Sequence, residues 1–368
     1  MDRDDDRSNR HAAGLAAAVV VVALVAFVVY GNSLHVPFLL DDEVTILANP
    51  SIRHLGDLGA VLQPPTHVFS AGRPLLNLTF ALNYAFGGTS EAGYHAVNVL
   101  IHVLAALVLF GIVRRTLQLP QFRWNDARTP TFLAVAVASL WGLHPLLTAT
   151  VTYVSQRAES LMALFYLLTL YGFIRAATSP GSRAWAVVSV GACLLGALTK
   201  EVIITVPLLV LLYDRAFRSG SFIVGLRTRA GLYAGYVAAW ACLAWLMMAT
   251  HVETRGVGFT QGVSSWAYGL AETRALVRYV TLALWPHPLV FDYGAEFLKA
   301  PPSETVGAVL LVCAGVAATI WVWRRWAPLG FAAGAFFLIL APTSSVVPIA
   351  LQPMAENRMY LPLAAAMV

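Results

Sequence analysis

The stretch HAAGLAAAVVVVALVAFVVY, residues 11–30, decides the fold class of this chain. It contains no Asp, Glu, Lys or Arg, and a helix needs about 20 mostly apolar residues to cross a bilayer. The polar start MDRDDDRSNR precedes it, and no small-residue cleavage site lies before the next polar stretch. We therefore expect a retained membrane anchor here and not a cleaved signal peptide.

The rest of the chain is similarly apolar. Of its 368 residues, 58% are hydrophobic and only 12% are charged, with a mean hydropathy of +0.70. Soluble domains carry roughly 25% charged residues, so this composition excludes an ordinary soluble enzyme. Further apolar runs lie at about 94–113, 131–147, 151–174, 185–199, 202–213, 230–250, 303–323, 328–342 and from 359 onward. We predict an all-α polytopic membrane protein with about nine to ten or more transmembrane helices.

The charged residues predict which way the chain is inserted. With residues 1–11 in the cytoplasm and 12–368 forming the membrane domain, the cytoplasmic side holds fifteen of the 24 basic residues and six of the 19 acidic ones. This asymmetry fits the positive-inside rule. The basic side then orients the chain against anionic lipid, so the net charge of +5 gives no reason to expect a nucleic-acid partner.

Two long segments are predicted on the outer side, residues 31–93 and 251–302. The second contains a helical stretch at 266–285 that carries Glu272, Arg274 and Arg278. A spanning helix rarely carries three charges, so we expect an interfacial or re-entrant helix there. Because the chain stops inside an apolar run, we also expect the natural protein to continue past Val368.

Three consecutive carboxylates, Asp41, Asp42 and Glu43, open the first outer segment. Neighbouring carboxylates push one another's pKa values apart, which suits at least one of them to proton transfer. The alternative is a solvated acidic turn, with Asn49-Pro50 as a further turn signal.

Other polar residues recur near the predicted outer ends of the apolar runs. Ionisable residues at membrane depth are functional candidates by default, and the alternative is a set of ion pairs such as Arg157–Glu159 and Lys200–Glu201, with hydrogen bonds between helices. His95 and His102 are seven residues apart, unlike the i, i+4 pair that chelates one ion, so we expect no cofactor, with a divalent metal left open. The three cysteines, Cys193, Cys242 and Cys313, lie singly in apolar runs and form no CxxC site.

These motifs, taken in order, resemble those of the GT-C glycosyltransferases, in particular the protein O-mannosyltransferase-like group whose members carry tetratricopeptide repeats after the membrane domain. The matching elements are Phe38-Leu-Leu-Asp41-Asp42 with Asn49-Pro50, Gly72-Arg73-Pro74 with Asn77, Tyr94-His95-Ala-Val-Asn98 with His102, His144-Pro145, Arg157-Ala-Glu159, Lys200-Glu201 and Glu356-Asn357-Arg358. Two features depart from the group: the repeats are missing, and only Trp285-Pro-His-Pro-Leu-Val-Phe-Asp292 is recognisable between 251 and 302.

The resemblance implies transfer of a sugar from a polyprenyl-phosphate donor to a hydroxyl of an acceptor protein or glycan at the outer face of the bilayer. It implies that Asp41 or Asp42 is the catalytic base, and that Arg157, Lys200 and Arg358 bind the donor phosphate. The supporting polar residues would be Glu43, Arg73, Asn77, His95, His144, Glu159, Glu201 and Glu356. A single displacement with inversion is expected, and a retaining route stays open.

Two other classes of function fit parts of the sequence. A transporter or flippase also has many spans with buried charges, but the repeated halves typical of transporters are not seen. A membrane anchor for a C-terminal module predicts no special role for the acids at 41–43. The scarcity of lysine and the arginine-rich loops suit a bacterial inner membrane with a periplasmic active site, and an endoplasmic reticulum location has the same topology.

Overall fold

A computed structural model of the protein describes residues 2–179, 183–249, 264–298, 301–344, 348–349 and 352–368. These residues form helices and no β-strand, which confirms the all-α class. The helices are α1 (Asp2–Tyr30), α2 (Leu58–Leu62), α3 (Pro74–Gly87), α4 (Glu91–Leu117), α5 (Thr129–Leu143), α6 (Thr148–Thr152), α7 (Arg157–Thr178), α8 (Arg183–Ala197), α9 (Val206–Asp214), α10 (Phe222–Thr228), α11 (Ala230–Ala249), α12 (Ser265–Leu284), α13 (Pro302–Arg325), α14 (Ala327–Leu340) and α15 (Pro362–Ala366).

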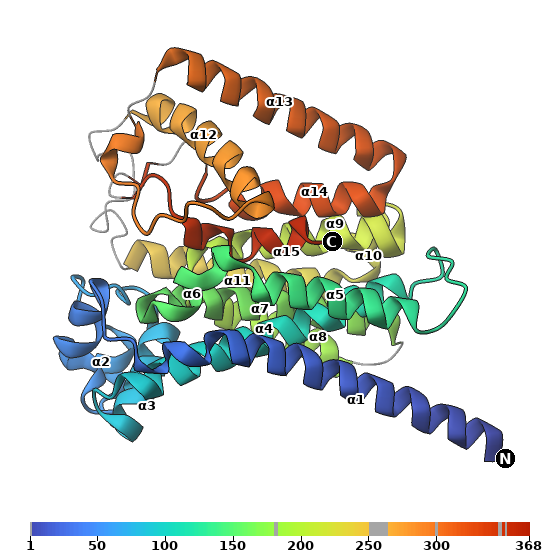
Figure 1. The fold of residues 1–368 in the computed structure, drawn as a ribbon, viewed down its shortest axis with the longest axis horizontal. Coiled ribbons are helices and arrows are strands. Elements are labelled where there is room, and N and C mark those ends of the chain that lie inside the picture. The colour runs from blue at the N-terminus through green and yellow to red at the C-terminus, as the bar shows by residue number, and fades with distance from the viewer. Residues whose placement is uncertain (1, 180–182, 250–263, 299–300, 345–347, 350–351) are drawn as a thin grey trace.

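The long helices run side by side along one direction of the bundle (Figure 1). Helix α4 packs against α1, α5 and α7, and α7 also packs against α8. Helices α2 and α3 gather at one end, which we call the loop end, and the N-terminus lies at the opposite end (Figure 1). The connection between α4 and α5 lies at that opposite end as well.

Several of these helices are able to cross a membrane. Among the described residues, five are long and apolar enough, or six if the bent pair α5 and α6 counts as one span. The protein is therefore a multi-pass membrane protein. The expected count of nine to ten spans stays a prediction, because α8 and α14 are apolar but shorter. The predicted helix at 266–285 is present as α12, and it is not among the candidate spans.

Helical structure is interrupted twice at the loop end, between α5 and α6 and between α8 and α9. Between α5 and α6 the axis bends by 53° at His144-Pro145, because proline disfavours helical backbone in the residue before it. Between α8 and α9 the chain is extended at Lys200 (φ −156°, ψ 147°) and then forms a 3-10 turn at Glu201–Thr205. Both interruptions place polar side chains at the loop end of the bundle.

The first loop, residues 31–93, contributes most of a second, smaller apolar core, which Tyr94, Val154 and Ala158 complete from the helical bundle. Ile46, Ile52, Val61, Leu76 and Phe80 are fully buried in a cluster separate from the main one. These apolar contacts make the loop a folded element that is seated on the end of the bundle.

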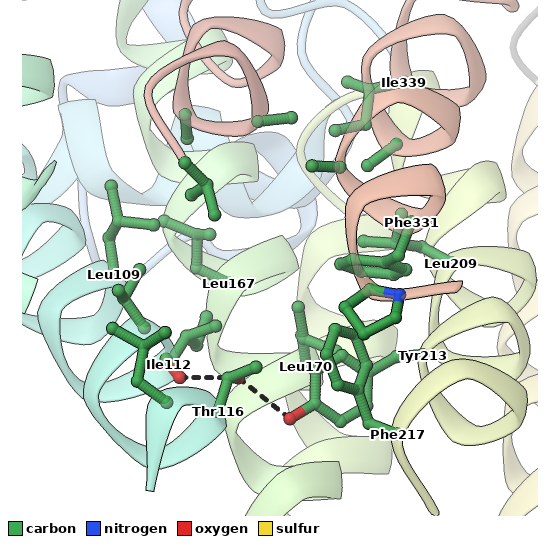
Figure 2. A pocket seen from close by; sticks show the side chains of 18 of the residues that line it. Leu109, Ile112, Thr116, Leu167, Leu170, Leu209, Tyr213, Phe217, Phe331 and Ile339 are labelled. Carbon is green, nitrogen blue, oxygen red and sulfur yellow. Dashed lines mark hydrogen bonds between the residues drawn. The ribbon is translucent and has the colours of Figure 1, made fainter. Parts of the chain in front are cut away.

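An apolar cavity of about 280 Å³ lies between α4, α7, α9, α14 and α15. Figure 2 shows its side chains, in which the hydroxyl of Thr116 bonds to that of Tyr213 at 2.8 Å. The C-terminal half of α4 lines this cavity. The N-terminal half of the same helix contacts the first loop through His95. The polar residues predicted from the sequence therefore lie away from it.

Candidate functional site

The turn of residues 153–157, between α6 and α7, makes hydrogen bonds to several distant segments of the chain. Tyr153 is extended (φ −89°, ψ 115°) and ends α6, and a 3-10 turn over Val154–Gln156 leads into α7. Tyr153, Ser155, Gln156 and Arg157 are all buried. Tyr153 and Ser155 bond to the first loop, Gln156 to the segment 356–358, and Arg157 to α3 and α4.

Asp42 is held by this turn. Its side chain is 1% exposed. One carboxylate oxygen accepts hydrogen bonds from the backbone N–H of Ser155 at 2.7 Å and from the Ser155 hydroxyl at 2.5 Å. The other oxygen accepts from the backbone N–H of Leu39 at 3.2 Å. Burial raises the pKa of Asp42 above its ordinary value of 3.8, although the bonds from Ser155 and Leu39 lower it. Both oxygens of Asp42 are thus engaged in fixing the loop.

Asp41 has the opposite environment. Its side chain is exposed, as is that of Glu43, while its backbone N–H donates to the hydroxyl of Tyr153 at 2.9 Å. The residue before it, Leu40, has a φ of +43°, a left-handed conformation that non-glycine residues adopt at a cost. The turn therefore presents the Asp41 carboxylate outward while its neighbour Asp42 is buried.

Arg157 lies at the centre of a network of neutral acceptors. Its guanidinium donates to Asn98 Oδ1 at 2.7 Å, to Asn83 Oδ1 at 2.7 Å and to the carbonyl of Tyr94 at 2.9 Å. It also bonds to Thr79 and lies over the ring of Phe80, 4.6 Å from its centre. Since Arg157 is fully buried and its three nitrogens all have protein acceptors, it ties α3, α4 and α7 together.

A row of charges joins the first loop to the interruption after α8. Lys200 bonds to Glu159, and Glu201 pairs with Arg73 at 3.4 Å. The backbone N–H of Leu75 donates to the carbonyl of Leu198 at 3.1 Å and brings the two segments together. The ion pairs therefore run between elements, whereas the sequence suggested pairs between neighbours in the chain.

The segment 356–358 reaches the same turn. Asn357 donates to the Gln156 side chain at 2.6 Å. Glu356 accepts from Tyr293 and from the backbone of Val290, and burial raises the pKa of Glu356. Arg358 is buried, paired with Glu272 at 3.4 Å.

The remaining predicted residues hold the backbone in place. Asn77 is fully buried and bonds to Asn49, Ser51, Ser70 and the carbonyl of Val61. His95 bonds to the carbonyl of Val36 at 2.9 Å, and His144 to that of Ala283 at 3.1 Å. Asn77 and His95 thus hold the first loop, and His144 joins the break after α5 to α12.

The structure thus brings most of the predicted residues into one connected polar region at the loop end. Its central contacts come from residues that are not among the predicted site residues: Tyr153, Ser155, Gln156, Asn98 and Asn357. Asn98 and Asn357 lie in motifs of the family resemblance. For Tyr153, Ser155 and Gln156 the available signal was a polar stretch directly before the apolar helix α7. Among the described residues, no three His, Cys, Asp or Glu side chains gather as a metal site would require.

The fold and this region define a multi-pass, all-α membrane protein with an exposed carboxylate at one end of the bundle. The chain is 29% identical to the protein O-mannosyl-transferase Tmtc1 of Drosophila melanogaster over 78% of its own length and 35% of the relative's. It is 26% identical to Tmtc2 of the same organism over 79% and 32%, and 34% identical to human TMTC4 over 51% and 28%. No family model and no solved structure matches it.

The chain is therefore similar to the TMTC protein O-mannosyl-transferases, as the ordered motifs predicted. It spans about a third of the length of these relatives.

Proposed function

We propose that this chain is the membrane domain of a glycosyltransferase of the GT-C type, with Asp41 as its general base. The enzyme would transfer a sugar, mannose by analogy with the names of its relatives, from a polyprenyl-phosphate carrier to a hydroxyl of a protein or glycan. In this proposal the loop end faces the periplasm or lumen, as the arginine distribution favours.

The observation that carries the proposal is the contrast between the two neighbouring aspartates. A general base needs a carboxylate that an acceptor hydroxyl is able to reach within hydrogen-bond distance. Asp41 is exposed, whereas Asp42 is buried and bonded through both oxygens. This contrast favours Asp41 as the base and gives Asp42 the role of holding the loop.

The reaction in this proposal is a single displacement. The acceptor oxygen forms a bond to the anomeric carbon, and the bond from that carbon to the phosphate oxygen breaks, with its electron pair leaving on the phosphate. The hydroxyl proton moves to the Asp41 carboxylate. The leaving polyprenyl phosphate then gains a negative charge that a nearby cation stabilises.

Lys200 is the cation best suited to that phosphate. Its ammonium group has three donors and one bonded partner that the structure gives, Glu159. Arg157 and Arg358 are more fully bonded to protein acceptors, so in this proposal they position the site. Arg73, paired with Glu201 and 11% exposed, is a second candidate for contact with the donor.

The test compares Asp41→Asn with Asp42→Asn and Glu43→Gln in the full-length protein. We expect Asp41→Asn to lower sugar transfer from a radiolabelled polyprenyl-phosphate donor by roughly 10²–10⁴-fold, the usual contribution of a general base. Glu43→Gln is the matched control, because Glu43 is an exposed acid two residues away, and it should stay near wild type.

Asp42→Asn should reduce the yield of folded protein, since its new amide N–H₂ would face the N–H of Leu39 or Ser155. Full transfer activity in Asp41→Asn would refute Asp41 as the base. A wild-type protein that moves intact lipid-linked sugar across vesicles without transferring it would support the flippase alternative.

A further inference from the structure

We infer that Tyr153 is a positioning residue for Asp41: its hydroxyl fixes the strained turn that presents this carboxylate to the acceptor. The inference rests on the proposed function, since it assigns Asp41 the role of base. It assigns a role to Tyr153, which is not among the candidate site residues predicted from the sequence.

The turn around Asp41 has few hydrogen bonds of its own. Its own bonds are Asp42 N–H to the carbonyl of Leu39 at 2.8 Å, Glu43 N–H to that of Leu40 at 3.1 Å and Leu39 N–H to the Asp42 carboxylate at 3.2 Å. Leu40 is left-handed within it, with a φ of +43°. A non-glycine residue persists in such a conformation only when the surrounding structure over-determines it.

Two contacts with the 153–157 turn supply that constraint. The Tyr153 hydroxyl accepts the N–H of Asp41, directly after the left-handed residue. Ser155 binds the carboxylate of Asp42 through its N–H and its hydroxyl. The two anchors are adjacent in the first loop and two residues apart in the turn, so together they fix both the place and the direction of the Asp41 backbone.

Tyr153 is itself rigidly held. Its side chain is 5% exposed, and its ring packs against that of Phe291, with centroids 5.3 Å apart. Burial raises the pKa of the Tyr153 hydroxyl, and the charge of Asp41 beside it raises it further. The hydroxyl therefore stays protonated.

The two anchors differ in the residue that they bind. Ser155 acts on Asp42 and holds the loop, while Tyr153 reaches the residue that carries the proposed base. A base that is displaced by about 1 Å loses roughly 100-fold in rate. Loss of the Tyr153 hydroxyl should therefore affect turnover more than it affects donor binding.

The experiment is Tyr153→Phe in the full-length protein, which keeps the ring against Phe291 and removes only the hydroxyl. Donor-binding sites are counted by titration with a phosphonate analogue of the polyprenyl-phosphate sugar, and turnover is expressed per site. We expect kcat per site to fall by roughly 10–100-fold, with the donor KM within about twofold of wild type, because the cations that would hold the phosphate are untouched. A merely structural role would reduce the number of sites and leave turnover per site unchanged.

The matched control is Tyr213→Phe, which removes a buried tyrosine hydroxyl bonded to Thr116 at 2.8 Å at the far end of α4. It should leave kcat per site unchanged. Ser155→Ala is the second variant: it removes one anchor of the same turn, so kcat per site should also fall, by a smaller factor because the Ser155 N–H still binds Asp42.

Wild-type kcat per site in Tyr153→Phe would overturn the inference while leaving the proposed function intact, provided that Asp41→Asn is inactive. If Tyr153→Phe gives no donor-binding sites at all, the hydroxyl serves the fold and not turnover, which would overturn the inference as well. If Asp41→Asn is fully active, the proposed function fails, and the inference fails with it.

Discussion

At the scale of single residues, neighbours in the sequence take opposite roles because a turn separates their environments. Asp41 and Asp42 have the same side chain, and only the second has its carboxylate covered by Ser155 and Leu39. Leu40, directly before the pair, has a left-handed backbone with a φ of +43°. The 67% exposed side chain of Leu40 contributes little packing, so its backbone conformation dominates its effect on stability.

Substitutions at Leu40 test this interpretation. Leu40→Gly removes a strain of about 1–2 kcal/mol that a non-glycine residue has in left-handed backbone. It also costs roughly 0.5–1 kcal/mol of stability, because glycine gives the unfolded chain more conformational freedom. We therefore expect its melting temperature in detergent to be equal to or above that of wild type. Leu40→Val should melt lower, because a β-branched residue is least tolerant of positive φ.

The control is Leu39→Gly at the neighbouring position, which is not left-handed. That variant should be destabilised by roughly 0.5–1 kcal/mol. If Leu40→Gly and Leu39→Gly were destabilised equally, Leu40 would not be strained.

At the scale of elements, close helix packing depends on small residues. Between α7 and α8, a Cβ built on Gly172 would lie 2.9 Å from the backbone nitrogen of Ser189. The Ser189 hydroxyl bonds to the carbonyl of Thr169 at 2.6 Å and to the hydroxyl of Tyr236 at 2.7 Å. In membranes, helices associate through such close approaches and polar contacts, so Gly172 sets the distance between α7 and α8, and Ser189 links α8 to α11.

Gly172→Ala should therefore destabilise the protein. Forcing a methyl group against backbone costs about 1–3 kcal/mol, which exceeds the gain of about 1 kcal/mol in helix propensity. Gly191→Ala on α8 is the matched control, because no heavy atom lies within 4 Å of its added Cβ, and it should be neutral or stabilising. Thermal melting in detergent measures both, and a stable Gly172→Ala would show that the helices separate freely.

At the scale of the whole molecule, the polar region and the arginine-rich connections lie at opposite ends of the bundle. The first loop, with α2 and α3, is at the loop end, while the N-terminus and the α4–α5 connection are at the other (Figure 1). Arg114, Arg115, Arg123 and Arg128 lie in or beside that connection. The positive-inside rule then favours a cytoplasmic position for it.

Cysteine labelling tests this orientation. In a protein whose cysteines Cys193, Cys242 and Cys313 are replaced, Gly56→Cys in the first loop should react with a membrane-impermeant maleimide in intact spheroplasts. Asn125→Cys, in the α4–α5 connection, should react only after the membrane is permeabilised. Both positions are exposed, so accessibility within the protein does not decide the result. The reverse pattern would place the acidic turn in the cytoplasm and contradict the proposed site of transfer.

Much of the fold followed from the sequence because a bilayer imposes simple rules. Long apolar runs such as residues 11–30 must become helices, since no water is present to bond the backbone. The polar motifs at 41–43, 157–159 and 200–201 were found for the same reason: charged groups are rare and conspicuous at membrane depth. The relation to the mannosyltransferases also followed from the order of these motifs.

The sequence by itself thus determined the helical membrane fold and the approximate set of polar residues. Only the tertiary structure decided which of Asp41 and Asp42 is exposed, and that Glu159 pairs with Lys200 and Glu201 with Arg73. The physical reason is distance along the chain: Asp42 meets Ser155 across 113 positions and Asp41 meets Tyr153 across 112. These contacts depend on where helices α6 and α7 meet and on how the first loop packs against them. The local spacing of apolar residues does not encode either.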